Sequence, residues 1–355
     1  MASPDICIVG AGIIGLSLAL ELHSRGAEVV VVEQGVPLAE ASTAAAGMLA
    51  AGDPENPPQI RKLSELSRNL YPGFLNRLFD LSGITVPFQT NTTLQEIHSS
   101  HLESARGLTV LSSETLSLML PQLDASNRRF ILLDENSLDP RELAQALLAS
   151  VKAAGIGVRS GEPVQRICKS SVGVEIHTTS NSLNARRVVD CTGAWGVAKL
   201  TTGHVRPLPR KGQMLAVSLP PSLPLHLVVR TPDIYIVPRT TGAAAGRTII
   251  GATVEDAGFD KTVHPADVAS LKAEAAKLLP QIAQAPEVEA WAGLRPGSSD
   301  GLPLLGQVEE DVFVAAGHYR NGILLAPATA LVLAQVLSGE APQVDLAAFS
   351  PSRSG

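Results

Sequence analysis

The stretch DICIVGAGIIGLSLALELHSRGAEVVVVEQG, residues 5–35, decides which fold the chain can adopt. It starts with a short apolar run at residues 6–9, which is typical of a buried parallel strand. Three glycines then lead into a segment in which apolar residues have helical spacing, and a β-branched run at residues 29–32 ends at Glu33. The order of strand, turn, helix and strand predicts one unit of a parallel α/β sheet.

The three glycines have the spacing G-x-G-x-x-G, and each has its own physical role. Gly10 permits a tight turn, Gly12 lets the backbone approach a pyrophosphate, and Gly15 lets the helix pack closely on the strand. N–H groups at the start of the helix favour phosphate oxygens. We expect Glu33 to accept hydrogen bonds from ribose hydroxyls and to repel a 2′-phosphate. The stretch therefore predicts a site for an ADP-containing dinucleotide, NAD or FAD, and disfavours NADP.

Composition excludes several other classes of protein. With 355 residues, 45% hydrophobic and 17% charged, the chain can form one large or two medium globular domains. A net charge of −6 gives no electrostatic footprint for nucleic acid or an anionic membrane. Cys7, Cys168 and Cys191 lie in apolar runs and are expected to be buried thiols of a reducing compartment. With no basic leader before the first strand, we expect a cytoplasmic location.

Metal binding and membrane insertion are not expected. The pair His98 and His101 has no cysteine or carboxylate partner at a metal-ligand spacing. The longest apolar run, which starts at Gly322, is shorter than a membrane span and contains Pro327. We expect it to be a buried helix.

The middle of the chain changes its periodicity several times. A helix over residues 63–81 is expected from the spacing of its apolar residues, Leu66, Leu70, Phe74, Leu78 and Leu81. A strand follows near residues 130–138. Asp139 then predicts a helix N-cap, with Pro140 at the first helical position and Glu142 completing a capping box, so a helix is expected over residues 140–154.

Later segments suggest a second, antiparallel sheet. Alternating strands occupy residues 206–291, with one helix near 265–279. We therefore expect a mixed α/β and α+β fold, in which a discontinuous Rossmann-like dinucleotide-binding domain accompanies an antiparallel β-sheet domain that binds the substrate. The expected boundaries are 1–85, 140–205 and 293–345 for the first domain, 86–139 and 206–292 for the second, and 346–355 for a flexible tail.

Several further motifs follow the glycine fingerprint in a fixed order. They are STAAAGML (42–49), TGAW (192–195), YIVPR (235–239), AGLRPGSSDGLPLLG (292–306) and GHYRNGILLAPATA (317–330). Over essentially the whole chain, this set resembles the FAD-dependent amine oxidoreductases of the D-amino acid oxidase family, most closely the members that oxidise glycine. The resemblance implies the substrate domain of that family.

The resemblance also implies FAD as the cofactor. In the related sarcosine oxidases a cysteine in the C-terminal half binds the flavin covalently, and this chain has no cysteine after Cys191, so non-covalent FAD is expected. The small side chains of residues 42–48 would lie beside the flavin, although they are equally compatible with a tight loop. The implied cofactor residues are Gly10, Gly12, Ile14, Gly15, Glu33, Ser42, Thr43, Ala45, Ala46, Gly47, Val164, Thr192, Gly193, Gly317, Asn321, Gly322, Ile323 and Leu324.

Substrate residues follow from the same resemblance. Arg295 matches an arginine that grips the substrate carboxylate, for which a guanidinium fork is suited. Tyr235 matches a tyrosine whose hydroxyl helps to hold that carboxylate, and Met48 is expected beside them. Arg320 matches a second arginine that either contacts the substrate or orients neighbouring backbone. Two positions depart from the family pattern, Asp233 in place of histidine and Val254 in place of methionine, and both bear on the choice of substrate.

The implied reaction is oxidation of glycine, sarcosine or a small D-amino acid to the imino acid, which water hydrolyses to the 2-oxo acid. O2 would reoxidise the flavin and give H2O2. A role in forming the thiazole of thiamine and a homotetrameric state are also implied. Two alternatives stay open: a D-amino acid or D-hydroxyproline dehydrogenase of the same fold that reduces a quinone or carrier, and a non-catalytic dinucleotide-binding protein.

Overall fold

The unit expected at residues 5–35 forms the centre of a six-stranded sheet in the computed structural model, which describes residues 4–97, 108–170, 173–196 and 207–353. The first strand of the unit pairs in parallel with both of its neighbours, and only the edge pair at the C-terminal end of the chain is antiparallel. The expected pair His98 and His101 lies outside the described residues. In spatial order the strands are β15 (Leu304–Glu309), β16 (Val312–Ala316), β9 (Arg187–Asp190), β1 (Ile6–Val9), β2 (Val29–Glu33) and β5 (Gly157–Ser160).

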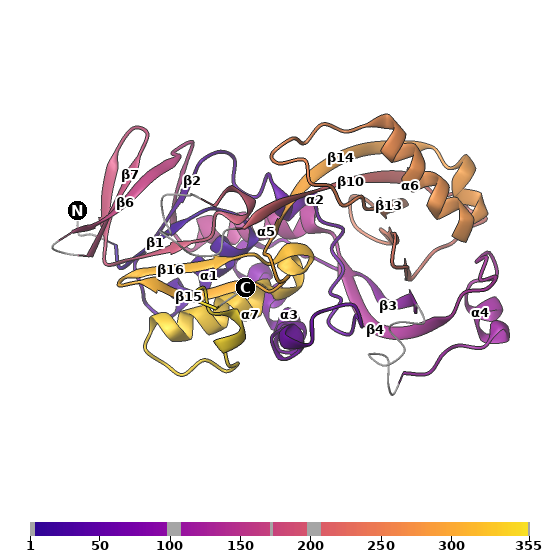
Figure 1. Cartoon of the computed structure of the whole chain (residues 1–355), viewed down its shortest axis with the longest axis horizontal. Coiled ribbons are helices and arrows are strands. Elements are labelled where there is room, and N and C mark those ends of the chain that lie inside the picture. Colours follow the sequence, from indigo (N-terminus) through magenta and orange to yellow (C-terminus); the bar gives the residue numbers. More distant parts are fainter. Residues whose placement is uncertain (1–3, 98–107, 171–172, 197–206, 354–355) are drawn as a thin grey trace.

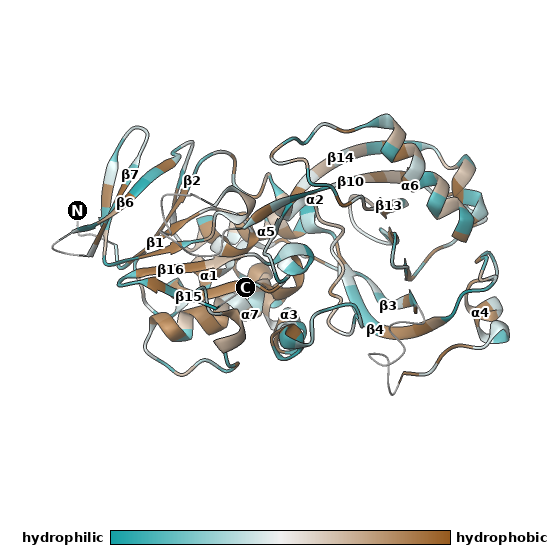
Figure 2. Ribbon diagram, viewed as in Figure 1, coloured by the Kyte–Doolittle hydropathy of each residue, from teal (hydrophilic) through white to brown (hydrophobic). Residues whose placement is uncertain are grey.

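Helices on this sheet bury the largest hydrophobic core. Strands β1 and β16 are mostly brown in Figure 2, which marks them as apolar. Nine of the twelve residues of the helix that follows β1 are buried, because it lies between the sheet and other helices. The helices of this part are α1 (Ile13–Ser24), α2 (Ala41–Ala44), α3 (Arg61–Ser82), α5 (Pro140–Ala153) and α7 (Gly322–Leu337).

Helix α3 forms where expected, but its most buried face is shifted from the row of apolar residues that predicts the helix. Its buried residues include Ser67 and Tyr71, whereas Leu66 and Leu70 are only half-buried. The reason lies in α7, where Pro327 has no N–H to donate to the carbonyl of Ile323. Tyr71 donates to that carbonyl instead, and the Ser67 hydroxyl lies between the next carbonyl and amide of α7. The hydrogen bonds that Tyr71 and Ser67 make with the backbone of α7 therefore determine which face of α3 is buried.

Helix α7 is the buried helix expected from the sequence. With the turn before it, residues Tyr319–Leu337 are long and apolar enough to cross a membrane by composition, and this is the one such segment among the described residues. However, 78% of its apolar window is buried inside the protein. Burial in the core accounts for its composition.

Helix α5 has half of its expected cap. The Asp139 carboxylate accepts a hydrogen bond from Arg141 N at 2.8 Å, and Pro140 occupies the first helical position. The prediction for Glu142 was wrong, because its carboxylate accepts from Ala243 N at 3.0 Å and not from the N-cap. Glu142 therefore ties the start of α5 to a loop of the second sheet.

The second sheet has seven strands and is antiparallel except for one pair, β11 with β3. Figure 1 shows it beside the six-stranded sheet, with α6 along one side. In spatial order its strands are β14 (Glu287–Gly297), β10 (Leu208–Ser218), β13 (Arg247–Gly251), β12 (Tyr235–Pro238), β11 (Val228–Arg230), β3 (Phe88–Glu96) and β4 (Phe130–Leu138); its helices are α4 (Ser113–Met119) and α6 (Pro265–Leu278).

A third, three-stranded sheet consists of β6 (Val164–Ser170), β7 (Gly173–Thr178) and β8 (Ser182–Ala185). All three cysteines are free thiols, and burial raises the pKa of Cys7 to about 12. The expectation of three buried thiols fails for Cys168, which is half-buried on β6 because that strand has one face toward solvent.

Two expected boundaries need correction. The limit between residues 292 and 293 falls inside β14, whose eleven residues all belong to the second sheet. The flexible tail at 346–355 is also wrong for residues 346–353. Phe349 is only 1% exposed, and the Arg353 guanidinium binds the Asp300 carboxylate. The remaining two-domain division stays a prediction.

The contact between Arg353 and Asp300 gives a first prediction. A hydrogen bond from Arg353 lowers the pKa of Asp300 to about 2. Because the folded pKa is depressed, the stabilisation is present above the unfolded value near 4 and is lost as the pH falls through the folded value. We expect Asp300→Asn to release residues 344–353 at neutral pH, and acid below about pH 4 to release them progressively in the wild type. Hydrogen exchange of this segment measures both effects.

A matched control is Glu310→Gln, which removes an exposed ion pair between the turn after β15 and Lys169 on β6. Exchange of residues 344–353 should not change in that variant. Unchanged protection in Asp300→Asn would contradict the interpretation.

Candidate active site

A cavity lies between the two large sheets, and the glycine fingerprint opens into it. Its wall includes residues of the turn after β1, the segment 41–48, strands β10 and β14, and the start of α7. A second pocket continues from the first, because both are lined by Gly12, Ala41, Ser42, Cys191 and Gly193. Together they form one elongated cavity.

Two of the fingerprint glycines lie where a larger side chain would not fit. Gly10 has a φ of 107°, and a Cβ on it would lie 2.5 Å from the carbonyl oxygen of Cys191. A Cβ on Gly15 would overlap the carbonyl oxygen of Gly10, so this glycine serves helix packing and does not line the cavity. Ser42 Oγ accepts from Ile13 N at 2.9 Å, at the first residue of α1. A polar oxygen already occupies the anion-favouring end of that helix.

The second pocket is lined by Glu33, Val164 and Thr192, which were predicted to bind the cofactor. The Glu33 carboxylate accepts from Ala11 N at 2.7 Å and from Gly35 N at 2.9 Å, which fixes it at the end of β2. Asp190 accepts from both the backbone and the hydroxyl of Thr192, which holds the turn at Gly193.

An aromatic pair at this end was not found from the sequence. Trp195 lines the pocket, and Phe259 from the other part of the chain stacks on it with ring centroids 4.8 Å apart and planes 20° apart. Lys261 Nζ lies 5.8 Å from the Trp195 ring and 2.9 Å from a carboxylate oxygen of Glu40. Trp195 belongs to the motif TGAW, but nothing in the sequence indicates its partner 64 residues later.

The small-residue segment 41–48 is fastened by its carbonyl groups. Trp291 Nε1 donates to Ala44 O at 3.0 Å, Arg239 Nη2 to Ala46 O at 2.9 Å, and Leu138 N to Gly47 O at 3.0 Å. A Cβ on Gly47, whose φ is 85°, would overlap the carbonyl of Leu138. Small side chains are therefore needed for contact with the second sheet as well as for the cavity.

The start of α7 forms another wall of the cavity. Asn321, Gly322 and Ile323 line it, whereas Leu324 is buried in the core and Gly317 lies outside both pockets. Thr43 also lies outside, because its hydroxyl donates to Leu38 O. The positive end of the α7 dipole faces the cavity, where it favours negative charge.

Arg295 reaches the cavity from β14. Its Nη1 donates to Thr253 O at 3.1 Å and Lys211 O at 3.4 Å. Within the described part of the chain, no carboxylate lies within ion-pair distance of it. A Cβ on Gly212 would overlap the guanidinium nitrogens, so this glycine provides the space that Arg295 occupies. The arginine is thus oriented by backbone carbonyls and keeps its charge available for an anionic ligand.

Tyr235 lies close to Arg295 at the edge of β12. Its hydroxyl donates to Met214 Sδ at 3.0 Å. Burial raises the pKa of Tyr235, while Arg295 opposes the shift. The hydroxyl therefore stays protonated at neutral pH and can donate a hydrogen bond. A Cβ on Gly251 would lie 2.6 Å from this hydroxyl, so a second glycine makes room for a side chain that lines the cavity.

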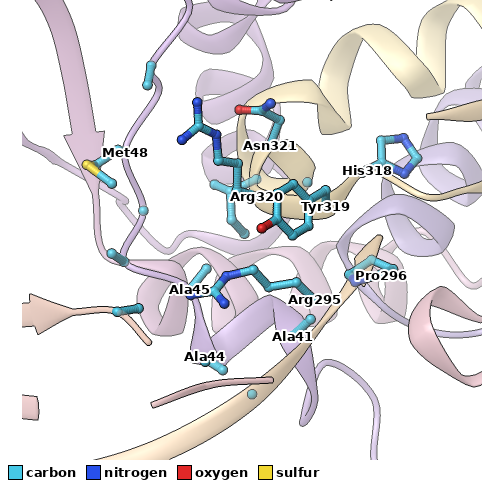
Figure 3. Close-up of a pocket in the computed structure, with 18 of the residues that line it drawn as sticks. Ala41, Ala44, Ala45, Met48, Arg295, Pro296, His318, Tyr319, Arg320 and Asn321 are labelled. Carbon is cyan, nitrogen blue, oxygen red and sulfur yellow. The ribbon is translucent and has the colours of Figure 1, made fainter. Parts of the chain in front are cut away.

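Arg320 lines the same cavity but is paired with carboxylates. It lies 3.2 Å from both Asp53 and Glu55, and Asp53 lies 3.8 Å from Arg230. In Figure 3, Arg295 and Arg320 lie on the same side of the pocket, and Met48 lies opposite them. The two guanidinium groups occupy separate positions. Of the two expected arginines, Arg295 alone has no such partner in the described residues.

His318 and Tyr319, beside Arg320, also line the cavity, although the sequence did not indicate a role for them. His318 is 3% exposed, its Nε2 lies 3.1 Å from Thr329 Oγ1, and burial lowers its pKa to about 3, so the ring is neutral. Tyr319 has a φ of 48°, which is rare outside glycine and recurs at functional sites. The two residues that depart from the family pattern, Asp233 and Val254, both line the cavity and are exposed.

Among the described residues, no cluster of three or more histidine, cysteine and acidic side chains could hold a metal ion. The polar groups of the cavity include the side chains of Arg295, Tyr235 and Arg320 and the backbone at the start of α7.

Comparison with known proteins agrees with this geometry. A model of the FAD dependent oxidoreductase family matches residues 5–336. A glycine oxidase of Geobacillus kaustophilus is 34% identical over 370 residues, which covers 98% of this chain and 97% of that protein. The crystal structure of glycine oxidase from Geobacillus kaustophilus superposes over all of both chains with a TM-score of 0.92 and 32% identity.

A second kind of relative is longer. The bifunctional protein ThiO/ThiG of Trichormus variabilis is 34% identical over 98% of this chain, which spans only 55% of that protein. The chain thus spans about half the length of such relatives. Sequence and structure together confirm the fold class and FAD as the cofactor, and the chain belongs to the DAO family of FAD-dependent oxidoreductases.

Proposed function

We propose that the chain oxidises a small amino acid, glycine first among the candidates, to its imino acid. The observation that carries the proposal is Arg295, a cation without a carboxylate partner among the described residues, next to the protonated hydroxyl of Tyr235 and beside the dinucleotide site. The names of the glycine oxidase relatives support glycine as the substrate. Sarcosine and small D-amino acids remain within the same class.

The described residues fit FAD. Gly10 and Gly12 leave the pocket wall without side chains, and the pocket with Glu33 continues from the fingerprint into the main cavity. When bound, FAD accepts a hydride from the α-carbon of the amino acid. The start of α7 presents backbone N–H groups to the same cavity and would stabilise negative charge there.

The chain's own residues would bind and orient the amino acid. Arg295 would pair with the carboxylate and Tyr235 would donate to it, which fixes the direction of the α-C–H bond. Met48 is proposed as a further residue of the substrate site. The predicted cofactor residues that line either pocket are proposed to contact FAD. Arg320 is proposed to orient the segment at Asp53 and Glu55, since its guanidinium is already paired with them.

Water would hydrolyse the imino acid to the 2-oxo acid and ammonia or an amine, and O2 is proposed as the electron acceptor. The name of the bifunctional relatives supports a role in forming the thiazole of thiamine. A cytoplasmic location and a homotetramer are kept as proposals.

The first test is the visible spectrum of the purified protein before and after anaerobic addition of glycine, sarcosine, D-alanine or D-proline. Loss of the oxidised flavin band with glycine or sarcosine supports the proposal and ranks the substrates. A flavin that stays oxidised with all four would contradict it. Release of H2O2 during aerobic turnover separates an oxidase from a dehydrogenase that uses a quinone or carrier.

Replacing Arg295 tests the carboxylate site. In Arg295→Lys a bidentate pair becomes a single contact, which typically costs about 1.5–3 kcal/mol. We expect KM to rise roughly 10- to 100-fold with FAD still bound. The matched control is Arg210→Lys, which lies opposite Arg295 on β10, pairs with Asp256 and does not line the cavity. Equal KM values in Arg295→Lys and the wild type would contradict the assignment.

Replacing Gly212 tests the space beneath that arginine. A Cβ at this position would overlap the guanidinium group, which is flexible and would move aside. We expect Gly212→Ala to raise KM for the amino acid while FAD content and the midpoint of thermal unfolding change little. Gly73→Ala is the control, since a Cβ there meets open space. If Gly212→Ala binds substrate as the wild type does, Arg295 does not act from this position.

Replacing Phe259 tests the nucleotide end. A stacked aromatic pair contributes about 0.5–1.5 kcal/mol. We expect Phe259→Ala to speed dissociation of FAD roughly 2- to 10-fold, as measured by the rise of flavin fluorescence on dilution. The control is Phe79→Ala, another half-exposed phenylalanine, on α3. Identical dissociation rates in the wild type and Phe259→Ala would show that the pair does not cover the cofactor.

A further inference from the structure

Strand β10 has a cavity face and a rear face. Gly212 and Met214 line the cavity, so the alternation of a strand places Lys211 and Gln213 on the opposite face. Both are fully buried, with exposed fractions of 0%. Helix α6 contributes Asp267 to this rear face, where it accepts from Gln213 Nε2 at 2.6 Å. A buried polar layer therefore lies directly behind the proposed carboxylate site.

Lys211 joins β10 to the segment that follows β13. Its N–H donates to Glu255 O and its carbonyl accepts from Glu255 N, both at 3.0 Å. Its Nζ lies 3.2 Å from Glu255 Oε2, the one carboxylate within ion-pair distance of it among the described residues. Removal of the Glu255 carboxylate would thus leave a fully buried ammonium group with no anionic partner, which is strongly unfavourable.

Glu255 connects this pair to Thr253 and Gln213. Its Oε1 accepts from Gln213 Nε2 at 2.8 Å and from the Thr253 hydroxyl. Burial raises the pKa of Glu255, but the hydrogen bonds from Thr253, Gln213 and Lys211 outweigh it, and the net shift is downward. Gln213 N also donates to Thr253 Oγ1 at 2.8 Å. The conformation of Thr253 is therefore fixed from two sides.

The same two residues supply the acceptors of Arg295. Its Nη1 donates to the carbonyls of Thr253 and Lys211, and its guanidinium group also interacts with the Tyr235 hydroxyl. The neighbours of Thr253, Ala252 and Val254, line the cavity. Any shift of the segment 252–255 would move both an acceptor of Arg295 and a wall of the cavity.

We propose that Lys211 and Glu255 are positioning residues for substrate binding. Their ion pair, in which Lys211 is fully buried and Glu255 is half-buried, holds the carbonyls of Lys211 and Thr253 in the arrangement that aims Arg295 at the carboxylate of the amino acid. Neither side chain lines the cavity, so both act through Arg295. This inference rests on the proposed function of the same site.

The test uses the holoenzyme and acetate, a carboxylate that lacks the amine and cannot be oxidised. Acetate binding is measured by the perturbation of the flavin absorbance, and steady-state turnover of glycine is measured alongside. We expect Lys211→Met and Glu255→Gln each to raise the dissociation constant of acetate and KM for glycine about tenfold, with kcat changed less than about threefold. The double variant should cost less than the sum of the two single variants, because the pair is coupled.

Controls separate positioning from general stability. Lys169→Met removes an exposed lysine that pairs with Glu310, and it should leave acetate binding unchanged. Thermal unfolding is recorded for every variant. A lowered unfolding midpoint with unchanged acetate binding in Lys211→Met would overturn the proposal, because it would mean a structural role alone. If a single variant does not fold, the double variant Lys211→Met/Glu255→Gln decides, since it leaves no buried charge without a partner.

Failure of this inference differs from failure of the proposed function. If Arg295→Lys leaves acetate binding unchanged, the assignment of the carboxylate site fails. If Arg295→Lys weakens acetate binding while Glu255→Gln and Lys211→Met bind acetate like the wild type, the site stands and the positioning role is overturned.

Discussion

The site depends on one close contact, the packing of the small-residue segment 41–48 against the second sheet. Ala41 and Ser42 line both pockets, and three carbonyls of the segment accept hydrogen bonds from Trp291, Arg239 and Leu138. The donors belong to or follow strands of the second sheet, whereas Ser42 reaches back to the first residue of α1. A larger side chain would separate the sheets. The cavity between them exists at this width because the backbone itself forms the wall.

Local chemistry explains what could be predicted from the sequence. The glycines at 10, 12 and 15 act within one turn, so their roles follow from spacing alone, and the same holds for the cap at Asp139. The buried face of α3 could not be found in this way. It depends on hydrogen bonds that Tyr71 and Ser67 donate to carbonyls of α7 near Pro327, about 250 residues later in the chain. The packed C-terminal segment likewise depends on Asp300, 53 residues from Arg353.

The two arginines of the cavity show the same limit. Their motifs placed both at the site, but the motifs did not distinguish their electrostatic states. Arg320 meets Asp53 and Glu55, which come from a loop that carries no recognisable signal, whereas Arg295 meets carbonyl groups and the Tyr235 hydroxyl and, among the described residues, no carboxylate. A paired guanidinium has little charge left for a ligand, and an unpaired one keeps it. The difference between the two arginines therefore follows from contacts between distant segments.

Strand β10 brings these constraints together, because its two faces have opposite tasks. The cavity face needs the smallest residue at Gly212, so that a guanidinium can lie against the backbone. A glycine has more backbone freedom than other residues. On the rear face, the ion pair of Lys211 and Glu255 restricts that freedom. A glycine that makes room for a substrate residue thus requires rigid neighbours. The same reasoning applies at Gly251, where Tyr235 lies against a strand that β10 holds through paired backbone.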